Sequence, residues 1–173
     1  MPRTNAGPEF AWDDQVAVRS VHFHDPDAPA ATIVTPSVFV AVHDEQGRFL
    51  LVQRCDSGAW EFPGGRMDVG ETAIAAAVRE TAEEAGVRVR ITGLVGLFSD
   101  PEFIIQPVAG EIRQPFVVCF HGVAEWGSPR PDKIETADAG WFEPAQVEAM
   151  MLEPGARRWI HHAIAGAREP HLE

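Results

Sequence analysis

A glycine-containing turn runs directly into a strongly acidic helical segment between residues 60 and 87. The stretch reads WEFPGGRMDVGETAIAAAVRETAEEAGV. On a helical wheel over residues 72–85, the side chains of Glu80, Glu83 and Glu84 fall within about a third of the circle. Like charges at these spacings repel one another, and Arg79 is the only cation within residues 72–85. The segment therefore predicts a helix whose carboxylates need a counter-charge.

The opposite side of this predicted helix is apolar and is expected to face the core. Its stripe consists of Ile74, Val78, Thr81, Ala82 and Ala85. Gly86 follows at the position where a left-handed residue commonly ends a helix.

The turn before the helix, Phe-Pro-Gly-Gly at residues 62–65, allows a close approach of the backbone to a ligand, because glycine has no Cβ. Three convergent carboxylates beside an exposed carbonyl oxygen form an all-oxygen site, which Mg²⁺ or Mn²⁺ prefers more than zinc does. A solvated acidic face is the alternative interpretation of the same pattern.

The net charge restricts the class of partner. The chain has 14 Lys and Arg against 26 Asp and Glu, a net charge of −12 with neutral histidines. No basic cluster is present, which argues against a nucleic-acid partner. Magnesium bridges carboxylates to substrate phosphates, so a small phosphate-bearing ligand is expected to bind together with its cations.

Composition and length indicate one globular domain. The 173 residues are 45% hydrophobic and 23% charged, and no apolar run is long enough to cross a bilayer. The N-terminus has no apolar signal-peptide core, so we expect no membrane partner and a cytoplasmic location. Cys55 and Cys119 match no metal-ligand spacing and are expected to be reduced thiols.

Strand and helix patterns alternate along the chain, which predicts the α/β class. Residues 35–43 and 48–54 are expected to form a hairpin, and residues 1–34 an N-terminal arm with one possible extra strand at 15–23. Glycines 93 and 96 are expected to divide the strand-like run 87–98. The further elements predicted within the domain at 35–170 are strands at 115–125 and 139–142, a helix starting at Pro144 and a closing helix over 155–168.

The acidic stretch resembles the Nudix box, a motif of fixed spacing. The matching positions are Gly65, Glu71, Arg79, Glu80, Glu83, Glu84, Gly86 and Val87. One position departs from the motif, because Thr81 occupies a place that is usually aliphatic. The resemblance implies a Nudix-type α/β/α sandwich with a mixed β-sheet. It also implies metal-dependent hydrolysis of nucleoside diphosphates that are linked to another group.

The resemblance further implies roles for individual residues. The expected ligands of Mg²⁺ or Mn²⁺ are the carbonyl of Gly64 and the carboxylates of Glu80, Glu83 and Glu84. Structural support of the site is expected from Gly65, Glu71 and Arg79. The general base is either Glu80 or a carboxylate on a later loop, where Glu135 ranks ahead of Asp138.

The substrate is the least determined feature. Arg54, Trp60, Phe98 and Asp100 are the candidate substrate-binding residues. The resemblance implies a substrate that carries a nucleoside diphosphate, which leaves a (modified) nucleoside triphosphate, ADP-ribose, a nucleotide sugar and a dinucleotide polyphosphate open, with the first two put forward. A non-catalytic nucleotide-sensing or protein-binding module is the alternative function. The apolar segment at 15–23 also suggests a homodimer.

Overall fold

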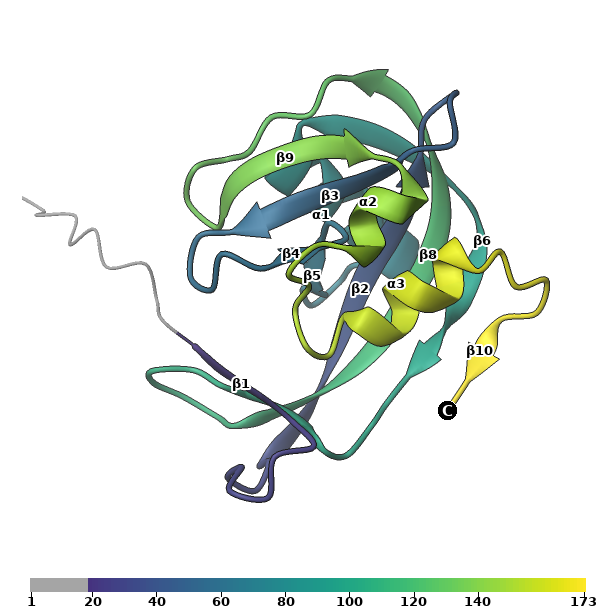
Figure 1. Ribbon diagram of the computed structural model, residues 1–173. Helices are drawn as coiled ribbons and strands as arrows, with labels where there is room; N and C mark the ends of the chain where they lie inside the picture. The colour runs from purple at the N-terminus through teal and green to yellow at the C-terminus, as the bar shows by residue number, and fades with distance from the viewer. Residues whose placement is uncertain (1–18) are drawn as a thin grey trace, which may run out of the picture.

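The computed structural model describes residues 19–173, which form a mixed ten-stranded sheet with helices on both faces (Figure 1). The strands are β1 (Ser20–Phe23), β2 (Ile33–His43), β3 (Phe49–Arg54), β4 (Trp60–Glu61), β5 (Gly64–Arg66), β6 (Val87–Phe98), β7 (Phe103–Gln106), β8 (Arg113–Gly127), β9 (Thr136–Phe142) and β10 (His171–Leu172). The helices are α1 (Ala73–Ala85), α2 (Pro144–Glu148) and α3 (Arg157–Ile164). The predicted α/β class and mixed sheet are confirmed.

Two long parallel strands, β2 and β8, form the centre of the sheet and pair from Ile33 with Arg113 to His43 with Val123. On the other edge of β8, the strand β6 runs antiparallel. The predicted hairpin is present, with β2 and β3 joined through a turn at Gly47, whose φ is +78°. Strand β5 pairs antiparallel with β2, with Gly64 opposite Phe39. The glycine turn that precedes α1 therefore lies beside a central strand of the sheet.

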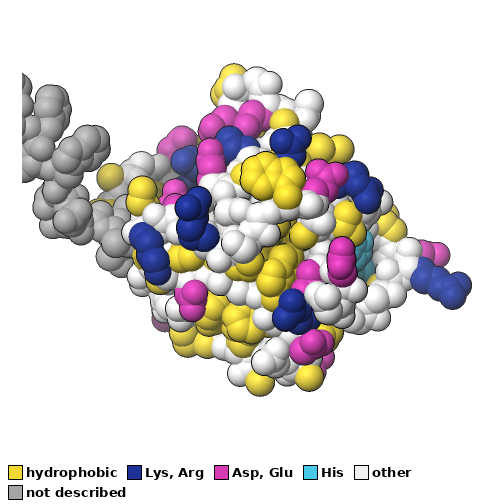
Figure 2. Space-filling model, turned by 90° about the horizontal axis from the view of Figure 1, so that it is seen from above, with side chains coloured by type: hydrophobic (Ala, Val, Ile, Leu, Met, Phe, Trp, Pro, Cys, Tyr) yellow, Lys and Arg dark blue, Asp and Glu magenta, His cyan; other side chains and the backbone are white. Residues whose placement is uncertain are grey.

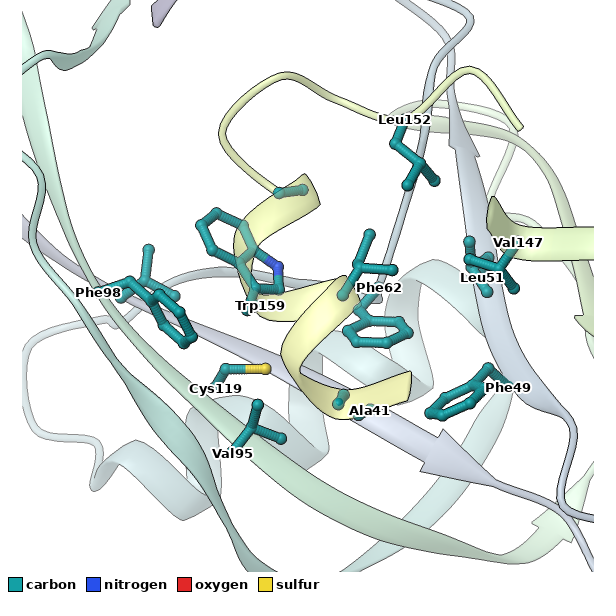
Figure 3. Close-up of a cluster of buried hydrophobic side chains, with 14 of the residues drawn as sticks. Ala41, Phe49, Leu51, Phe62, Val95, Phe98, Cys119, Val147, Leu152 and Trp159 are labelled. Atoms are coloured by element: carbon teal, nitrogen blue, oxygen red, sulfur yellow. The ribbon is translucent and has the colours of Figure 1, made fainter. Parts of the chain in front are cut away.

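The sheet separates two apolar clusters, because successive residues of β2 point to opposite faces. Val38, Val40 and Val42 pack with alanines of α1 on one face. Ala41 packs on the other face with residues of α2 and α3. In that second cluster Trp159 lies between Phe98 and Phe62 (Figure 3). This three-layer arrangement holds α1 and its acidic residues against the sheet.

Helix α1 has the predicted ends but a different buried face. The side chain of Thr72 accepts a hydrogen bond from the N–H of Ala75, and Gly86 ends the helix with φ of +67°. The predicted core stripe is wrong at two positions, because Ile74 is 54% exposed and Ala82 is also exposed. The buried residues are Ala76, Ala77, Thr81, Glu84 and Ala85.

The buried face is thus rotated toward the acidic side by about a quarter of a turn. Ala76 and Ala77 have little bulk, so the helix approaches the sheet closely there. Thr81 remains compatible with burial, because its hydroxyl donates to the carbonyl of Ala77 at 2.8 Å. The rotation carries Glu84 into the interior, where it is 4% exposed.

One strand prediction is also wrong, and a second can be compared with the structure only in part. Glycines 93 and 96 do not divide β6, which is continuous; register shifts against β8 occur between Ile91 and Gly93 and between Leu94 and Gly96. Glycine accommodates such bulges without ending the strand.

The strand predicted over residues 15–23 is present at Ser20–Phe23, while residues 15–18 lie outside the described part of the chain. Strand β1 pairs with β7 of the same chain and lies at the edge of the sheet. The homodimer stays a prediction.

The surface agrees with the composition. On the face shown in Figure 2, basic side chains lie scattered among acidic ones and form no continuous stripe. Cys55 and Cys119 are both free thiols, as expected. None of the helices in residues 19–173 has the length and apolar character that crossing a bilayer requires.

Candidate active site

A cleft of about 1070 Å³ opens beside the N-terminal part of β2, and it combines three kinds of surface. Its apolar floor includes Phe39, Phe103, Ile105 and Trp159. What we call the acidic side consists of Glu61, Glu80 and Glu135 on the cleft surface, together with the buried Glu84 behind Gly64. What we call the arginine side consists of Arg19, Arg66 and Arg113.

Glu84 is one of two buried carboxylates of the acidic side, together with Glu61. The N–H of Gly64 donates to its Oε2 at 2.9 Å. Burial raises the pKa of Glu84 well above its usual value, and the nearby charges of Glu61 and Glu80 raise it further. Only glycine fits at position 64, because a Cβ there would collide with the carbonyl oxygen of Val38. The turn and this carboxylate are therefore fitted to each other.

Glu80 lies one turn earlier on α1, against the next glycine. A Cβ on Gly65 would approach Glu80 Oε1 to 2.7 Å, so the glycine leaves room for the carboxylate. Burial raises the pKa of Glu80, as do the charges of Glu83 and Glu135, whereas Arg79 opposes the shift. The energetic cost of charging this carboxylate makes it a candidate for cation binding or proton transfer.

Arg79 is the cation that contacts most of the acidic motif. Its Nε and Nη2 donate to the two oxygens of Glu71 at 2.7 and 2.8 Å. Its Nη1 donates to Glu80 Oε1 at 2.9 Å and to Glu83 Oε2 at 3.1 Å. The hydrogen bonds from Arg79 lower the pKa of Glu71 to about 2. Arg79 thus joins the loop before α1 to two carboxylates of the helix.

Arg54, a candidate substrate-binding residue, does line the cleft but already has two carboxylate partners. It donates to Asp56 at 2.8 and 3.0 Å and to Glu61 Oε1 at 2.9 Å. Burial acts to lower the pKa of Arg54, but Glu61 and Asp56 outweigh it and raise the pKa. Glu61, which the two-residue strand β4 turns inward, was not among the predicted site residues. Its burial depends on the pairing of β4 with β3, which the sequence pattern did not reveal.

The loop before β9 places Glu135 on the cleft. The side chain of Asp132 accepts hydrogen bonds from the backbone N–H groups of Glu135 and Thr136 at 3.0 and 2.9 Å. Thr136 is buried, and its hydroxyl donates to the carbonyl of Glu84 at 2.9 Å. The loop is therefore anchored to α1. Asp138 instead accepts from the N–H of Ala139 at 2.8 Å and does not line the cleft.

Three other candidate substrate residues lie away from the cleft. Phe98 is 2% exposed and stacks on His171, so it offers no open ring face to a ligand. Asp100 is 8% exposed and pairs with His24 and Arg158. Trp60 packs edge-to-face on Phe142 at 5.0 Å and does not line the cleft. Sequence position could not separate these packing roles from ligand contact, because each depends on a partner far along the chain.

Comparison with known proteins agrees with the geometry of the glycine turn and acidic helix. A family model described as the NUDIX domain matches residues 34–163. The chain belongs to the NUDIX family. The predicted domain limits at residues 35 and 170 and the separate arm at 1–34 stay predictions, although β1 and β10 both join the sheet.

Relatives within the NUDIX family carry different names. A Bacillus subtilis protein provisionally named an 8-oxo-dGTP diphosphatase is 34% identical over 135 residues, covering 78% of this chain and 83% of the relative. An isopentenyl-diphosphate Δ-isomerase of Streptomyces griseus is 30% identical over 138 residues, covering 75% and 67%. The solved structure of an ADP-ribose pyrophosphatase from Streptococcus suis has a TM-score of 0.61 at 24% identity, covering 80% and 96%, which shows a shared fold.

The donor set of the acidic side fits a divalent cation in its chemistry. Its donors are carboxylate oxygens, the ligands that Mg²⁺ and Mn²⁺ prefer. Burial first, and then the negative charge of neighbouring glutamates, raises the pKa of both Glu80 and Glu84. Within residues 19–173 no three acidic, His or Cys side chains are grouped as a ready metal site. Arg79 contacts one oxygen each of Glu80 and Glu83.

Proposed function

We propose that this protein is a Mg²⁺- or Mn²⁺-dependent hydrolase that cleaves the diphosphate bond of a nucleoside diphosphate-linked substrate. The observation that carries the proposal is the position of the partly buried Glu80 and the buried Glu84 against the glycines of the turn, at the edge of a cleft large enough for a nucleotide. Buried carboxylates of raised pKa favour a divalent cation as their neutralising partner. The names of the relatives are consistent with substrates that contain a diphosphate.

The proposed ligands are the carbonyl of Gly64 and the carboxylates of Glu80, Glu83 and Glu84. When bound, the divalent cation lowers the pKa of water and neutralises charge on phosphate oxygens. The oxygen of a water forms a new bond to phosphorus, the bridging P–O bond breaks, and each product retains phosphate.

A carboxylate must accept the proton of the attacking water. Glu135 is the proposed base, because it lines the cleft and its charge acts on Glu80, whereas Asp138 is absent from the cleft surface. Glu80 is the alternative base. Arg79 orients Glu80 and Glu83 through its Nη1, and Glu71 fixes the guanidinium by holding Nε and Nη2.

The test is a substrate panel with product identification. The metal-stripped protein is supplied with Mg²⁺ and incubated with 8-oxo-dGTP, dGTP, ADP-ribose or isopentenyl diphosphate in ¹⁸O-labelled water. We expect hydrolysis of a nucleotide, loss of activity in EDTA, and ¹⁸O in one phosphate product. Glu80→Gln should be inactive, whereas Glu148→Gln should match wild type, because Glu148 is an exposed helical glutamate outside the cleft.

Two results contradict the proposal. Nucleotide binding without any product favours the non-catalytic module, and rearrangement of isopentenyl diphosphate without release of phosphate indicates an isomerase. An equal effect of Glu80→Gln and Glu148→Gln on turnover would remove Glu80 from the site.

A further inference from the structure

The three residues of the arginine side come from distant parts of the sequence. Arg66 ends β5 opposite Ser37, and Arg113 begins β8 opposite Ile33, so they flank the first half of β2 from its two neighbouring strands. Arg19 directly precedes β1, which β7 connects to β8. The sheet topology therefore concentrates three guanidinium groups at one end of the cleft.

Only Arg19 has counter-ions there. Its guanidinium lies 3.0 Å from Asp56 and 3.7 Å from Glu153. Arg66 and Arg113 form no ion pair with any residue of the 19–173 range. The Nε of Arg113 is buried and finds no acceptor among those residues. Two cations without an ion pair therefore line the same cleft.

The charge environment of Arg113 indicates that the site is suited to an anion. Burial lowers the pKa of Arg113, and the charges of Arg66 and Arg19 lower it further. A buried donor without an acceptor and a cluster of like charges both cost free energy. An anion bound between the guanidinium groups would remove both costs, and phosphate oxygens match the two-donor edge of a guanidinium.

The arginine side is adjacent to the acidic side. Arg66 directly follows Gly65, whose backbone lies against Glu80, and both Arg66 and Glu80 line the same cleft. A single ligand can therefore contact both sides when one of its phosphates lies beside the carboxylates of the acidic side and a further anionic group lies beside the arginine side.

We propose that Arg66 and Arg113 bind a terminal phosphate of the substrate, beyond the phosphorus that water attacks. This assigns the substrate to the nucleoside triphosphates, in contrast to a nucleoside diphosphate joined to a neutral sugar, such as ADP-ribose. The inference rests on the proposed function for the position of cleavage, but the anion site itself does not.

The kinetic test compares Arg66→Gln and Arg113→Gln with wild type on dGTP, 8-oxo-dGTP and ADP-ribose. Each variant should raise KM for the triphosphates about tenfold with kcat within about twofold, because each removes charge-assisted hydrogen bonds to one phosphate. KM for ADP-ribose should stay the same. Arg90→Gln is the matched control, since Arg90 is an exposed arginine on β6 outside the cleft.

A binding test separates this inference from catalysis. Inorganic tripolyphosphate is titrated into the full-length protein in EDTA, and its dissociation constant is measured by calorimetry. Arg113→Gln should weaken binding about tenfold, whereas Arg90→Gln should leave it unchanged. The melting temperature of each variant is measured in parallel. We expect Arg113→Gln to melt at or above wild type, because the substitution removes repulsion from Arg66 and Arg19.

The outcomes distinguish the two proposals. Tripolyphosphate binding that depends on Arg113 in a protein without hydrolytic activity supports the anion site and overturns the proposed function. Equal rises in KM for dGTP and ADP-ribose overturn the assignment to triphosphates. Binding that is as strong in Arg66→Gln and Arg113→Gln as in Arg90→Gln overturns the anion site.

Discussion

The two sides of the cleft carry opposite charge and are assembled in different ways. Most of the acidic side comes from one continuous segment, in which the glycine turn and α1 follow each other directly. The arginine side needs strands β5 and β8 and the residue before β1 to meet across the sheet. A local motif can therefore be identified from spacing, whereas a site built by strand pairing is hidden until the topology is known.

The sides also differ in how their charge is held. Glu84 is nearly fully buried and has one backbone donor, the N–H of Gly64. Arg66 is exposed, and Arg113 is partly exposed with a buried Nε. The burial of Glu84 makes the stability of the acidic side depend on a bound cation. The partly exposed arginine side is instead suited to bind a substrate group that dissociates after each turnover. Three predictions test the acidic side, and a fourth concerns residues outside the cleft; they follow in order of decreasing effect.

The largest effect is expected for turnover when one of the proposed cation ligands on α1 loses its charge. Glu83→Gln and Glu84→Gln should each lower kcat by about 10² to 10³, because removing one group that stabilises transition-state charge typically has this effect. Steady-state kinetics with saturating Mg²⁺ measures it, with Glu148→Gln as control. Near-wild-type turnover in both variants would show that Glu83 and Glu84 do not hold a catalytic cation.

The second prediction concerns cation binding and stability. Mg²⁺ at about 100 times its dissociation constant should stabilise the fold by about 2.7 kcal/mol. For a chain of this size that corresponds to a rise of about 5–10 °C in melting temperature. EDTA should reverse the rise, and Glu84→Gln should reduce it. A melting curve that Mg²⁺ leaves unchanged at millimolar concentration would argue against a cation site on the acidic side.

The third prediction compares two glutamates of the same helix without metal. Glu84→Gln should raise the melting temperature by about 2–4 °C, or about 1 kcal/mol, because it removes a buried charge that Glu61 and Glu80 repel. Glutamine still offers an oxygen to the N–H of Gly64. Glu83→Gln should change stability by less than about 0.5 kcal/mol, since the Glu83 side chain is 59% exposed. Thermal melting in EDTA tests both variants. A larger rise in melting temperature for Glu83→Gln than for Glu84→Gln would contradict the burial of Glu84 and the exposure of Glu83.

The smallest effect is expected for the stability of the fold at low pH, through two histidines that do not line the cleft. Burial lowers the pKa of His43 and of His121, whose rings stack at 6.1 Å. As pH falls below about 6.5, the unfolded chain therefore binds more protons than the folded one, and stability decreases. Because both rings are partly exposed, we expect less than about 1 kcal/mol.

The double variant His43→Gln/His121→Gln should lose less stability than wild type between pH 7.5 and 5.5. Melting temperatures measured across this range in EDTA provide the comparison. Identical slopes for the two proteins would assign the acid sensitivity to other groups.

Local rules account for the part of the fold that was predicted correctly. Thr72 and Gly86 set the ends of α1, Gly47 sets the hairpin turn, and Pro144 starts α2, because each acts through its own backbone geometry. The same rules misplaced the buried face of α1. An apolar count favoured Ile74, but the helix turned its small alanines and Glu84 inward to fit the sheet and the glycine turn.

The family motif, the acidic helix and the chemistry of its oxygen donors can be inferred from the amino-acid sequence alone, because they lie within one segment whose spacing is fixed by helix geometry. Which charges meet depends on tertiary packing. The packing of α1 brought Glu84 beside Glu61, and the Thr136 anchor brought Glu135 to the cleft while leaving Asp138 outside. Strand pairing around β2 placed Arg66 near Arg113, although 47 positions separate them along the chain (113 − 66). Such contacts depend on sheet register, which no local spacing encodes.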